Sequence, residues 1–209
     1  MDDILLVCTG NQCRSPVGAE LLRIRLEAQG VRARVHSAGL HIRERTMNDD
    51  LVRALRDRGI DLSGHRSHGL ARDDVQRADL ILTMEHHQVG DVALLDPTAW
   101  SRTFTFKEIV RRSATAGQRA PDEPLDRWLA RVGARRTRLE LVGAWRDDIA
   151  DPAGGSLFEV ERTVDELDDL TARLVDLAWP RAGGRRRRAG RRGSRPLDGP
   201  NGAGGGPRR

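Results

Sequence analysis

The stretch that most constrains this chain is residues 4–26, where an apolar run, a loop and an amphipathic segment follow one another directly. Residues 4–7 are continuously apolar, which predicts a short buried strand. Pro16 stands where a helix would begin, and apolar residues then recur at helical spacing. The residues expected on the buried helix face are Val17, Leu21, Leu22, Ile24 and Leu26. The chain therefore turns from strand to helix through residues 8–15.

Residues 8–15, CTGNQCRS, have the composition of an anion-binding loop. Main-chain N–H groups of a tight loop can converge on one anion, and the start of a helix adds positive charge there. Arg14 carries a planar fork of donors that suits two phosphate oxygens. Cys8 would lie on the floor of the loop, where positive charge favours the nucleophilic thiolate. The candidate phosphate-binding residues are Thr9, Gly10, Asn11, Gln12, Cys13, Arg14 and Ser15.

The string CTGNQCRSP at residues 8–16 resembles the active-site loop of the low-molecular-weight protein tyrosine phosphatase family. The resemblance implies a cysteine-dependent enzyme that hydrolyses phosphomonoesters of proteins or small molecules. Cys8 would form a phosphocysteine, and Arg14 with the loop amides would neutralise the phosphate. The reaction also needs a group that protonates the leaving group and later deprotonates water.

Asp151 is the candidate for this general acid and base. Asp151-Pro152 comes just before the last predicted helix, where the family carries an Asp-Pro pair. Asp147 and Asp148 in the same segment, WRDDIADP, are close alternatives.

Further residues are expected to support the loop. The resemblance places Asn11, Ser37 and His65 in a network that holds its shape, and asparagine tolerates the left-handed backbone of such a loop. Ser15 is placed to donate a hydrogen bond to the Cys8 sulfur. Cys13 has two open interpretations: a packing residue of the loop, or the partner of oxidised Cys8 in a reversible disulfide.

Cysteine and histidine usage argues against other classes of protein. The two cysteines are five positions apart and make no disulfide framework, and no signal peptide or long apolar segment is present. We therefore expect a soluble cytoplasmic monomer. The histidines and cysteines lack zinc-site spacing, so we expect no metal and no cofactor.

The positive charge is concentrated at the C-terminal end. The chain has 209 residues and a net charge of +5, but residues 181–209 hold ten arginines and one acid and contribute +9. The other 180 residues thus carry about −4. We predict one phosphatase domain over residues 1–180 and a disordered Arg/Gly/Pro-rich tail over residues 181–209. The tail is interpreted as a solvated terminus, with contact to polyanions as the alternative.

Strand and helix patterns alternate along the domain, which predicts a parallel sheet with helices on both faces. The family resemblance implies a three-layer α/β/α fold with four strands in the order 2-1-3-4 and the phosphate loop after the first strand. Further strands are expected at residues 31–36, 78–84 and 103–106, and helices at residues 49–59 (capped by Asn48 or Asp49), 85–95, 108–112 and 156–179. Residues 113–150 are interpreted as an insertion that borders the site, or as a solvated surface segment.

Substrate choice stays open because the chain departs from tyrosine-directed relatives. Residues 153–155, Ala-Gly-Gly, follow Asp151-Pro152 where those relatives often carry aromatic residues, and the chain has no tyrosine. Gln12 replaces an apolar residue and is similar to the polar residue of the phosphoarginine phosphatase branch. Trp100, Trp128 or Trp145 could still cover the site. The alternatives are a protein phosphoarginine phosphatase, an arsenate reductase with an external thiol, and a non-catalytic phosphate-binding protein.

Overall fold

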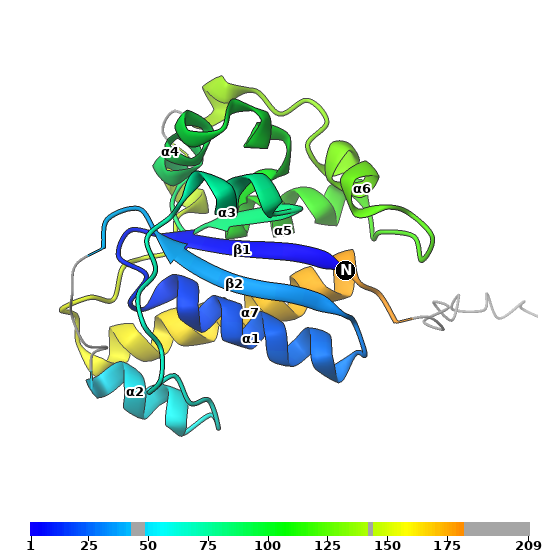
Figure 1. Cartoon of the computed structure of the whole chain (residues 1–209). Helices are drawn as coiled ribbons and strands as arrows, with labels where there is room; N and C mark the ends of the chain where they lie inside the picture. The colour runs from blue at the N-terminus through cyan, green and yellow to red at the C-terminus, as the bar shows by residue number, and fades with distance from the viewer. Residues whose placement is uncertain (43–48, 142–143, 182–209) are drawn as a thin grey trace, which may run out of the picture.

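The computed structural model describes residues 1–42, 49–141 and 144–181, and its centre is a four-stranded sheet (Figure 1). The strands lie in the order β2-β1-β3-β4, and all neighbouring pairs are parallel. They are β1 (Asp2–Cys8), β2 (Ala33–Gly39), β3 (Leu80–Thr83) and β4 (Thr103–Thr105). The predicted sheet order 2-1-3-4 is confirmed.

Helices cover both faces of this sheet (Figure 1). The α-helices are α1 (Arg14–Ala28), α2 (Asp49–Arg56), α3 (Arg72–Arg77), α4 (His86–Leu95), α5 (Phe106–Ala116), α6 (Leu125–Val132) and α7 (Leu157–Ala178). Short 3-10 helices span Pro97–Arg102, Arg138–Leu141 and Trp145–Asp147.

The three layers follow from the alternation of side chains along the strands. Ile4 and Leu6 of β1 pack in one buried cluster with residues of α1 and α7, whereas Leu5 and Val7 pack in a second cluster that includes Val92 of α4. Figure 1 accordingly shows α1 and α7 on one side of the sheet and α3 and α4 on the other. The expected α/β/α architecture is present.

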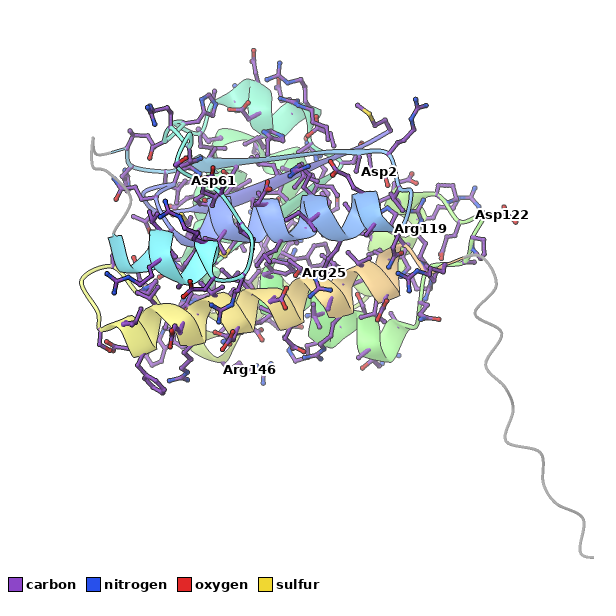
Figure 2. The ribbon with its side chains drawn as sticks, turned by 90° about the horizontal axis from the view of Figure 1, so that it is seen from below. Asp2, Arg25, Asp61, Arg119, Asp122 and Arg146 are labelled. Carbon is purple, nitrogen blue, oxygen red and sulfur yellow. The ribbon has the colours of Figure 1, made fainter. Side chains whose placement is uncertain are left out.

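The last long helix closes the domain against its first elements. α7 runs alongside α1 (Figure 2), and Arg25 of α1 forms a 2.6 Å ion pair with Asp168 of α7. Beyond the end of α7, the Trp179 indole donates a 2.9 Å hydrogen bond to Asp2 at the start of β1. The N-terminus and the end of the described chain therefore meet at the amino-terminal end of β1, opposite the 8–15 loop.

Two details of α1 differ from the expectation. The helix begins at Arg14, two residues before Pro16. A proline fits in this first turn because the N–H groups there need no partner within the helix. Ile24 was expected in the buried face but is 39% exposed. It lies two residues from both Leu22 and Leu26, and a two-residue step turns a helical side chain away from their shared face.

Other element bounds also shift. β2 begins at Ala33 and reaches Gly39, because it pairs with β1 as far as Cys8. α5 continues past the predicted end at residue 112 to Ala116, and Gly117, whose φ of +88° suits glycine, caps it. Asn48, a candidate cap of α2, lies outside the described residues.

The segment after α5 is packed into the domain. The Trp128 side chain of α6 is fully buried, and its indole N–H donates a 3.1 Å hydrogen bond to the Gly117 carbonyl. A wholly solvated segment is therefore excluded for α6. The assignment of residues 113–150 as an insertion stays a prediction.

Two further expectations concern membrane-spanning helices and the C-terminal tail. Within the described ranges, no helix combines the length and apolar character needed to cross a bilayer. Apart from Arg181, the predicted tail at residues 181–209 lies outside the part of the chain that the structure describes.

A buried ion pair joins the segment after α6 to α5. The Arg136 guanidinium donates to both carboxylate oxygens of Glu108, at 2.8 and 2.9 Å, and both side chains are almost fully buried. It also lies 4.1 Å from the centroid of the Trp100 ring, in cation–π range. Burial lowers the pKa of Arg136, and the Glu108 carboxylate opposes this shift. Glu108 therefore compensates a charge that could not be buried alone.

We expect Glu108→Gln to lower the free energy of unfolding by about 3 kcal/mol or more, because Arg136 would be left as an uncompensated buried charge. Guanidinium denaturation followed by circular dichroism measures this change. Glu140→Gln is the matched control, since Glu140 pairs with Arg112 at the surface, and its loss should be under about 1 kcal/mol. Equal effects of the two substitutions would contradict this assignment.

Candidate active site

The 8–15 loop lies at the carboxyl end of the central strand β1, between Cys8 and the first turn of α1. The Cys8 sulfur is buried, 3.0 Å from the Ser15 hydroxyl oxygen, and it accepts a 3.2 Å hydrogen bond from the Asn11 main-chain N–H. The loop thus curls around the sulfur and returns to it at both Asn11 and Ser15. Such donors stabilise negative charge on sulfur.

The Asn11 side chain is the internal brace of the loop. Asn11 is fully buried and has the left-handed backbone expected for it, with φ of +50°. Its amide nitrogen donates to the hydroxyls of Ser15 and Ser37, at 3.0 and 2.8 Å. Its amide oxygen accepts a 2.8 Å hydrogen bond from the His68 main-chain N–H. All of these polar atoms are satisfied, so the loop is held in one shape.

The main-chain oxygen of Asn11 is held from the other side. It accepts a 2.7 Å hydrogen bond from His65 Nε2 and a 3.0 Å hydrogen bond from the Ser67 hydroxyl. The structure therefore brings Ser37 and His65 together with Asn11. The contribution of Ser67 was not predicted.

The end of β2 approaches the loop so closely that only glycine fits there. A Cβ atom on Gly39 would lie 2.9 Å from the Asn11 nitrogen and 3.0 Å from the Gly10 carbonyl carbon. These contacts are with main-chain atoms, which cannot swing away as a side chain can. Because Gly39 has no side chain, the end of β2 can lie directly against the main chain of the 8–15 loop.

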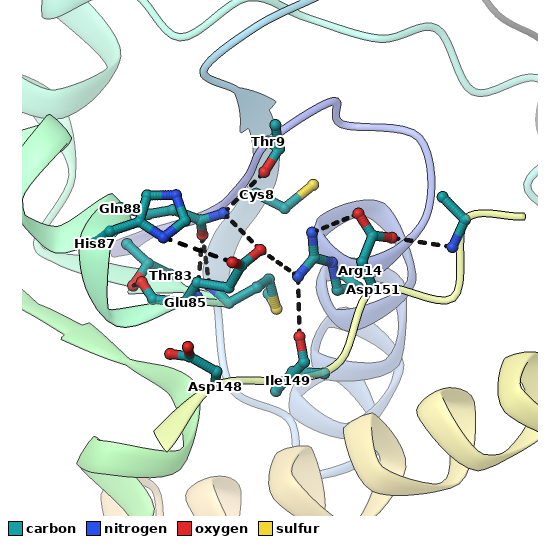
Figure 3. Close-up of polar contacts among 12 residues, drawn as sticks. Cys8, Thr9, Arg14, Thr83, Glu85, His87, Gln88, Asp148, Ile149 and Asp151 are labelled. Atoms are coloured by element: carbon teal, nitrogen blue, oxygen red, sulfur yellow. Dashed lines mark hydrogen bonds and ion pairs between the residues drawn. The ribbon is translucent and has the colours of Figure 1, made fainter. Parts of the chain in front are cut away.

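Arg14 is the other fixed point of the site. Its side chain is only 2% exposed, and its guanidinium donates to Glu85 Oε1 at 2.6 Å, to the Ile149 carbonyl at 2.9 Å and to Asp151 Oδ2 at 2.9 Å. Figure 3 shows this guanidinium and the Cys8 sulfur on the same side, within the curve of the 8–15 loop. The two groups expected to face one phosphate therefore lie together.

The contacts of the three candidate acids differ. Asp151 pairs with Arg14 and accepts a 3.1 Å hydrogen bond from the Ala153 N–H, and its side chain is 49% exposed. Asp147 is buried in a two-bond pair with Arg111. Asp148 accepts hydrogen bonds from the main chain and ring of His86. Among these three acids, only Asp151 has a carboxylate that contacts Arg14 and is open to solvent.

Two further residues of the site, Glu85 and Gln88, were missed from the sequence. Glu85 lies in the turn after β3 and Gln88 in the first turn of α4, a segment that was interpreted only as the start of a helix. The buried Gln88 accepts from the Met84 and Glu85 N–H groups and donates to the Thr9 hydroxyl at 3.2 Å, so it links this turn to the loop (Figure 3). The carboxyl ends of parallel strands share one edge. This rule could have flagged polar residues directly after β3.

The side chains of Gln12 and Cys13, also in the loop, are partly buried. Burial, with the nearby negative charges of Cys8 and Asp151, raises the pKa of the Cys13 thiol to about 12. Cys13 is therefore a neutral thiol at ordinary pH, and it packs against the core. The Gln12 side chain lies alongside Gly10, where a Cβ would be 3.8 Å from Gln12 Cδ.

The tryptophans suggested as covers of the site are found in different surroundings. Trp128 is in the core, and Trp100 lies beneath the Arg136 guanidinium. Trp145 is exposed. No group of three or more His, Cys, Asp or Glu side chains suited to a metal ion occurs among the described residues.

Comparison with known proteins identifies a family to which this chain is similar. The family model described as low molecular weight phosphotyrosine protein phosphatase matches residues 3–128, more than half of the chain. The low molecular weight protein-tyrosine-phosphatase Etp of Escherichia coli K12 is 37% identical over 106 residues, which are 50% of this chain and 69% of Etp. A protein-arginine-phosphatase of Bacillus subtilis is 30% identical over 174 residues, 83% of this chain and 94% of the relative.

A solved structure extends the match. The YwlE arginine phosphatase, as a cysteine-to-serine mutant with a phosphorylated active site serine, superposes with a TM-score of 0.62 at 28% identity and covers 83% of this chain and 93% of that one. The residues that the family model matches, 3–128, include the 8–15 loop and nearly all of the four-stranded sheet. The chain therefore belongs to the low molecular weight phosphotyrosine protein phosphatase family.

Proposed function

We propose that this protein is a cysteine-based protein phosphatase in which Cys8 is the nucleophile, Arg14 binds the phosphate and Asp151 is the general acid and base. The observation that carries the proposal is the convergence of these three groups at the carboxyl end of β1, with Asp151 2.9 Å from the Arg14 guanidinium. Family membership and the phosphorylated active site serine of the YwlE mutant support a phosphoenzyme route.

In the first step, the Cys8 sulfur attacks phosphorus and the bond from phosphorus to the leaving group breaks. Main-chain N–H groups of residues 9–15 and the Arg14 guanidinium hold the three remaining phosphate oxygens. Asp151 donates a proton to the leaving group.

In the second step, water attacks the phosphocysteine. Asp151 now accepts a proton from the water, and the sulfur leaves as a thiolate. The Ser15 hydroxyl, 3.0 Å from the sulfur, is placed to donate a hydrogen bond to it as negative charge returns. Asn11, Ser37 and His65 keep the loop in the shape that both steps require.

The proposed substrate class is phosphotyrosine, and the alternative is phosphoarginine. The phosphoarginine candidate is favoured by the 174-residue match to a protein-arginine-phosphatase and by Gln12 in the loop. Residues 153–155 beside Asp151 are Ala-Gly-Gly and offer no ring on which a phenyl group could stack. The remaining candidates are arsenate reduction, for which Cys13 is the only further thiol in the chain, and phosphate binding without turnover.

The domain limits and setting are also proposals. Residues 1–180 would form the phosphatase domain, with residues 113–150 as an insertion. The protein would act as a cytoplasmic monomer on phosphorylated proteins, and the basic tail at residues 181–209 is a candidate for contact with polyanions.

We expect Cys8→Ser to reduce turnover of p-nitrophenyl phosphate by at least about 1,000-fold, because the hydroxyl is a far weaker nucleophile. Calorimetry should still detect binding of inorganic phosphate, since Arg14 and the loop amides remain. Cys13→Ser is the control and should keep most of the activity. Turnover that persists in the Cys8 variant would reject Cys8 as nucleophile.

We expect Asp151→Asn to slow hydrolysis of phenyl phosphate by about 100-fold or more, because its leaving group needs a proton. p-Nitrophenyl phosphate, with a better leaving group, should be affected much less in the phosphorylation step. Burst kinetics separate this step from the hydrolysis of the phosphoenzyme. Asp148→Asn is the matched control, and a stronger leaving-group dependence in that variant would move the acid to Asp148.

A panel of phosphotyrosine, phosphoarginine and phosphoserine peptides, with arsenate reduction beside it, tests the substrate class. We expect kcat/KM for the phosphoarginine peptide to equal or exceed that for phosphotyrosine. Gln12→Leu, an apolar residue of similar size, should shift the ratio toward phosphotyrosine. A wild-type preference of more than about tenfold for phosphotyrosine, which is about 1.4 kcal/mol, would reject the arginine candidate.

A further inference from the structure

Glu85 connects Arg14 to a titratable side chain outside the proposed catalytic set. One carboxylate oxygen of Glu85 lies 2.6 Å from the Arg14 guanidinium, and the other lies 3.5 Å from Nδ1 of His87 (Figure 3). Gln88 Nε2 lies 3.4 Å from the first oxygen and thereby limits its rotation. Arg14, Glu85 and His87 therefore form a continuous chain of charged and titratable groups.

The two ends of this chain differ in exposure. Arg14 is buried, whereas the His87 side chain is 50% exposed. Histidine is the side chain whose charge ordinarily changes between pH 5 and 8. A proton taken up at His87 therefore adds one positive charge next to the carboxylate that balances Arg14.

We propose that His87 is a positioning residue that adjusts oxyanion binding at Arg14 through Glu85. The proposal rests on the proposed function, in which Arg14 binds phosphate. With neutral His87, the Glu85 carboxylate is engaged by Arg14 alone among these charged groups and offsets much of its charge. With protonated His87, the same carboxylate is shared between two cations, and Arg14 keeps more of its positive charge for a bound dianion.

The other charged groups near His87 do not replace this link. The His86 ring meets the His87 ring edge to face, at 6.0 Å between centroids, but its Nδ1 is paired with Asp148. Lys107 on α5 is turned to the Asp148 carbonyl and to Glu166. Asp151 reaches the guanidinium through the other terminal nitrogen of Arg14. Within the contacts of the described residues, Glu85 is thus the acid that joins His87 to Arg14.

The test uses sulfate, a dianion whose own charge is constant near neutral pH. The Cys8→Ser background removes titration of the Cys8 thiol and any turnover, while Cys13 stays neutral because the pKa of its thiol is raised to about 12. Sulfate affinity is measured by calorimetry at constant ionic strength between about pH 5.5 and about pH 8. In this background, affinity should be about three- to tenfold higher at the lower pH.

Two substitutions at residue 87 separate charge from packing. His87→Gln has a polar neutral side chain and should bind sulfate weakly at both pH values. His87→Lys carries a lasting charge and should bind it tightly at both. His36→Gln is the matched control, because His36 also pairs with an acid, Asp3, but at the other end of β1, and it should keep the full pH dependence.

The outcomes are distinct. Loss of the pH dependence in both residue-87 variants, with the control unchanged, supports the proposal. The same pH dependence in His87→Gln as in the parent protein, or its loss in His36→Gln, overturns it. No sulfate binding in any protein at any pH would overturn the oxyanion site itself, and this inference with it.

Discussion

The arrangement of the site depends on one buried cation, the Arg14 guanidinium. A charge removed from water must be compensated by nearby acceptors. Arg14 meets this need with a carboxylate from the turn after β3, and with a carbonyl and a second carboxylate from the segment before α7. Segments that are 71 and 135 or more residues away in the chain are therefore drawn to the carboxyl end of β1. The carboxylate of the proposed acid, Asp151, is thereby held at the Arg14 guanidinium.

Two hydrogen-bond networks meet at the 8–15 loop, and they fix different parts of the site. One is centred on Asn11 and gives the loop its shape, with Gly39 leaving the space beneath it. The other is centred on Arg14 and sets the direction of its guanidinium. Gln88 joins them, since its amide contacts both the Thr9 hydroxyl and the turn that carries Glu85. A change in the turn after β3 can thus reach the loop without altering any residue of the loop itself.

Most of the fold was accessible from the sequence because its signals are local. The apolar run of β3 and the leucine spacing of α7 each predict an element on their own, and both were found close to their predicted bounds. The two errors have different causes. Ile24 is exposed because its spacing from Leu22 and Leu26 turns it away from their face of α1, which the pattern already contained. β2 extends to Gly39 because β1 offers it partners that far, which the pattern does not contain.

The same division holds for the site. Residues 4–26 by themselves predicted a strand, a loop suited to an anion and a helix, and the family resemblance of residues 8–16 predicted roles in that loop for Cys8, Asn11, Arg14 and Ser15. The tertiary structure alone decided that Glu85 and Gln88 join them and that Asp151, unlike Asp147 and Asp148, reaches Arg14. The reason is physical: a loop's own shape follows from neighbouring residues, but the partners of a buried charge are chosen by packing between distant segments.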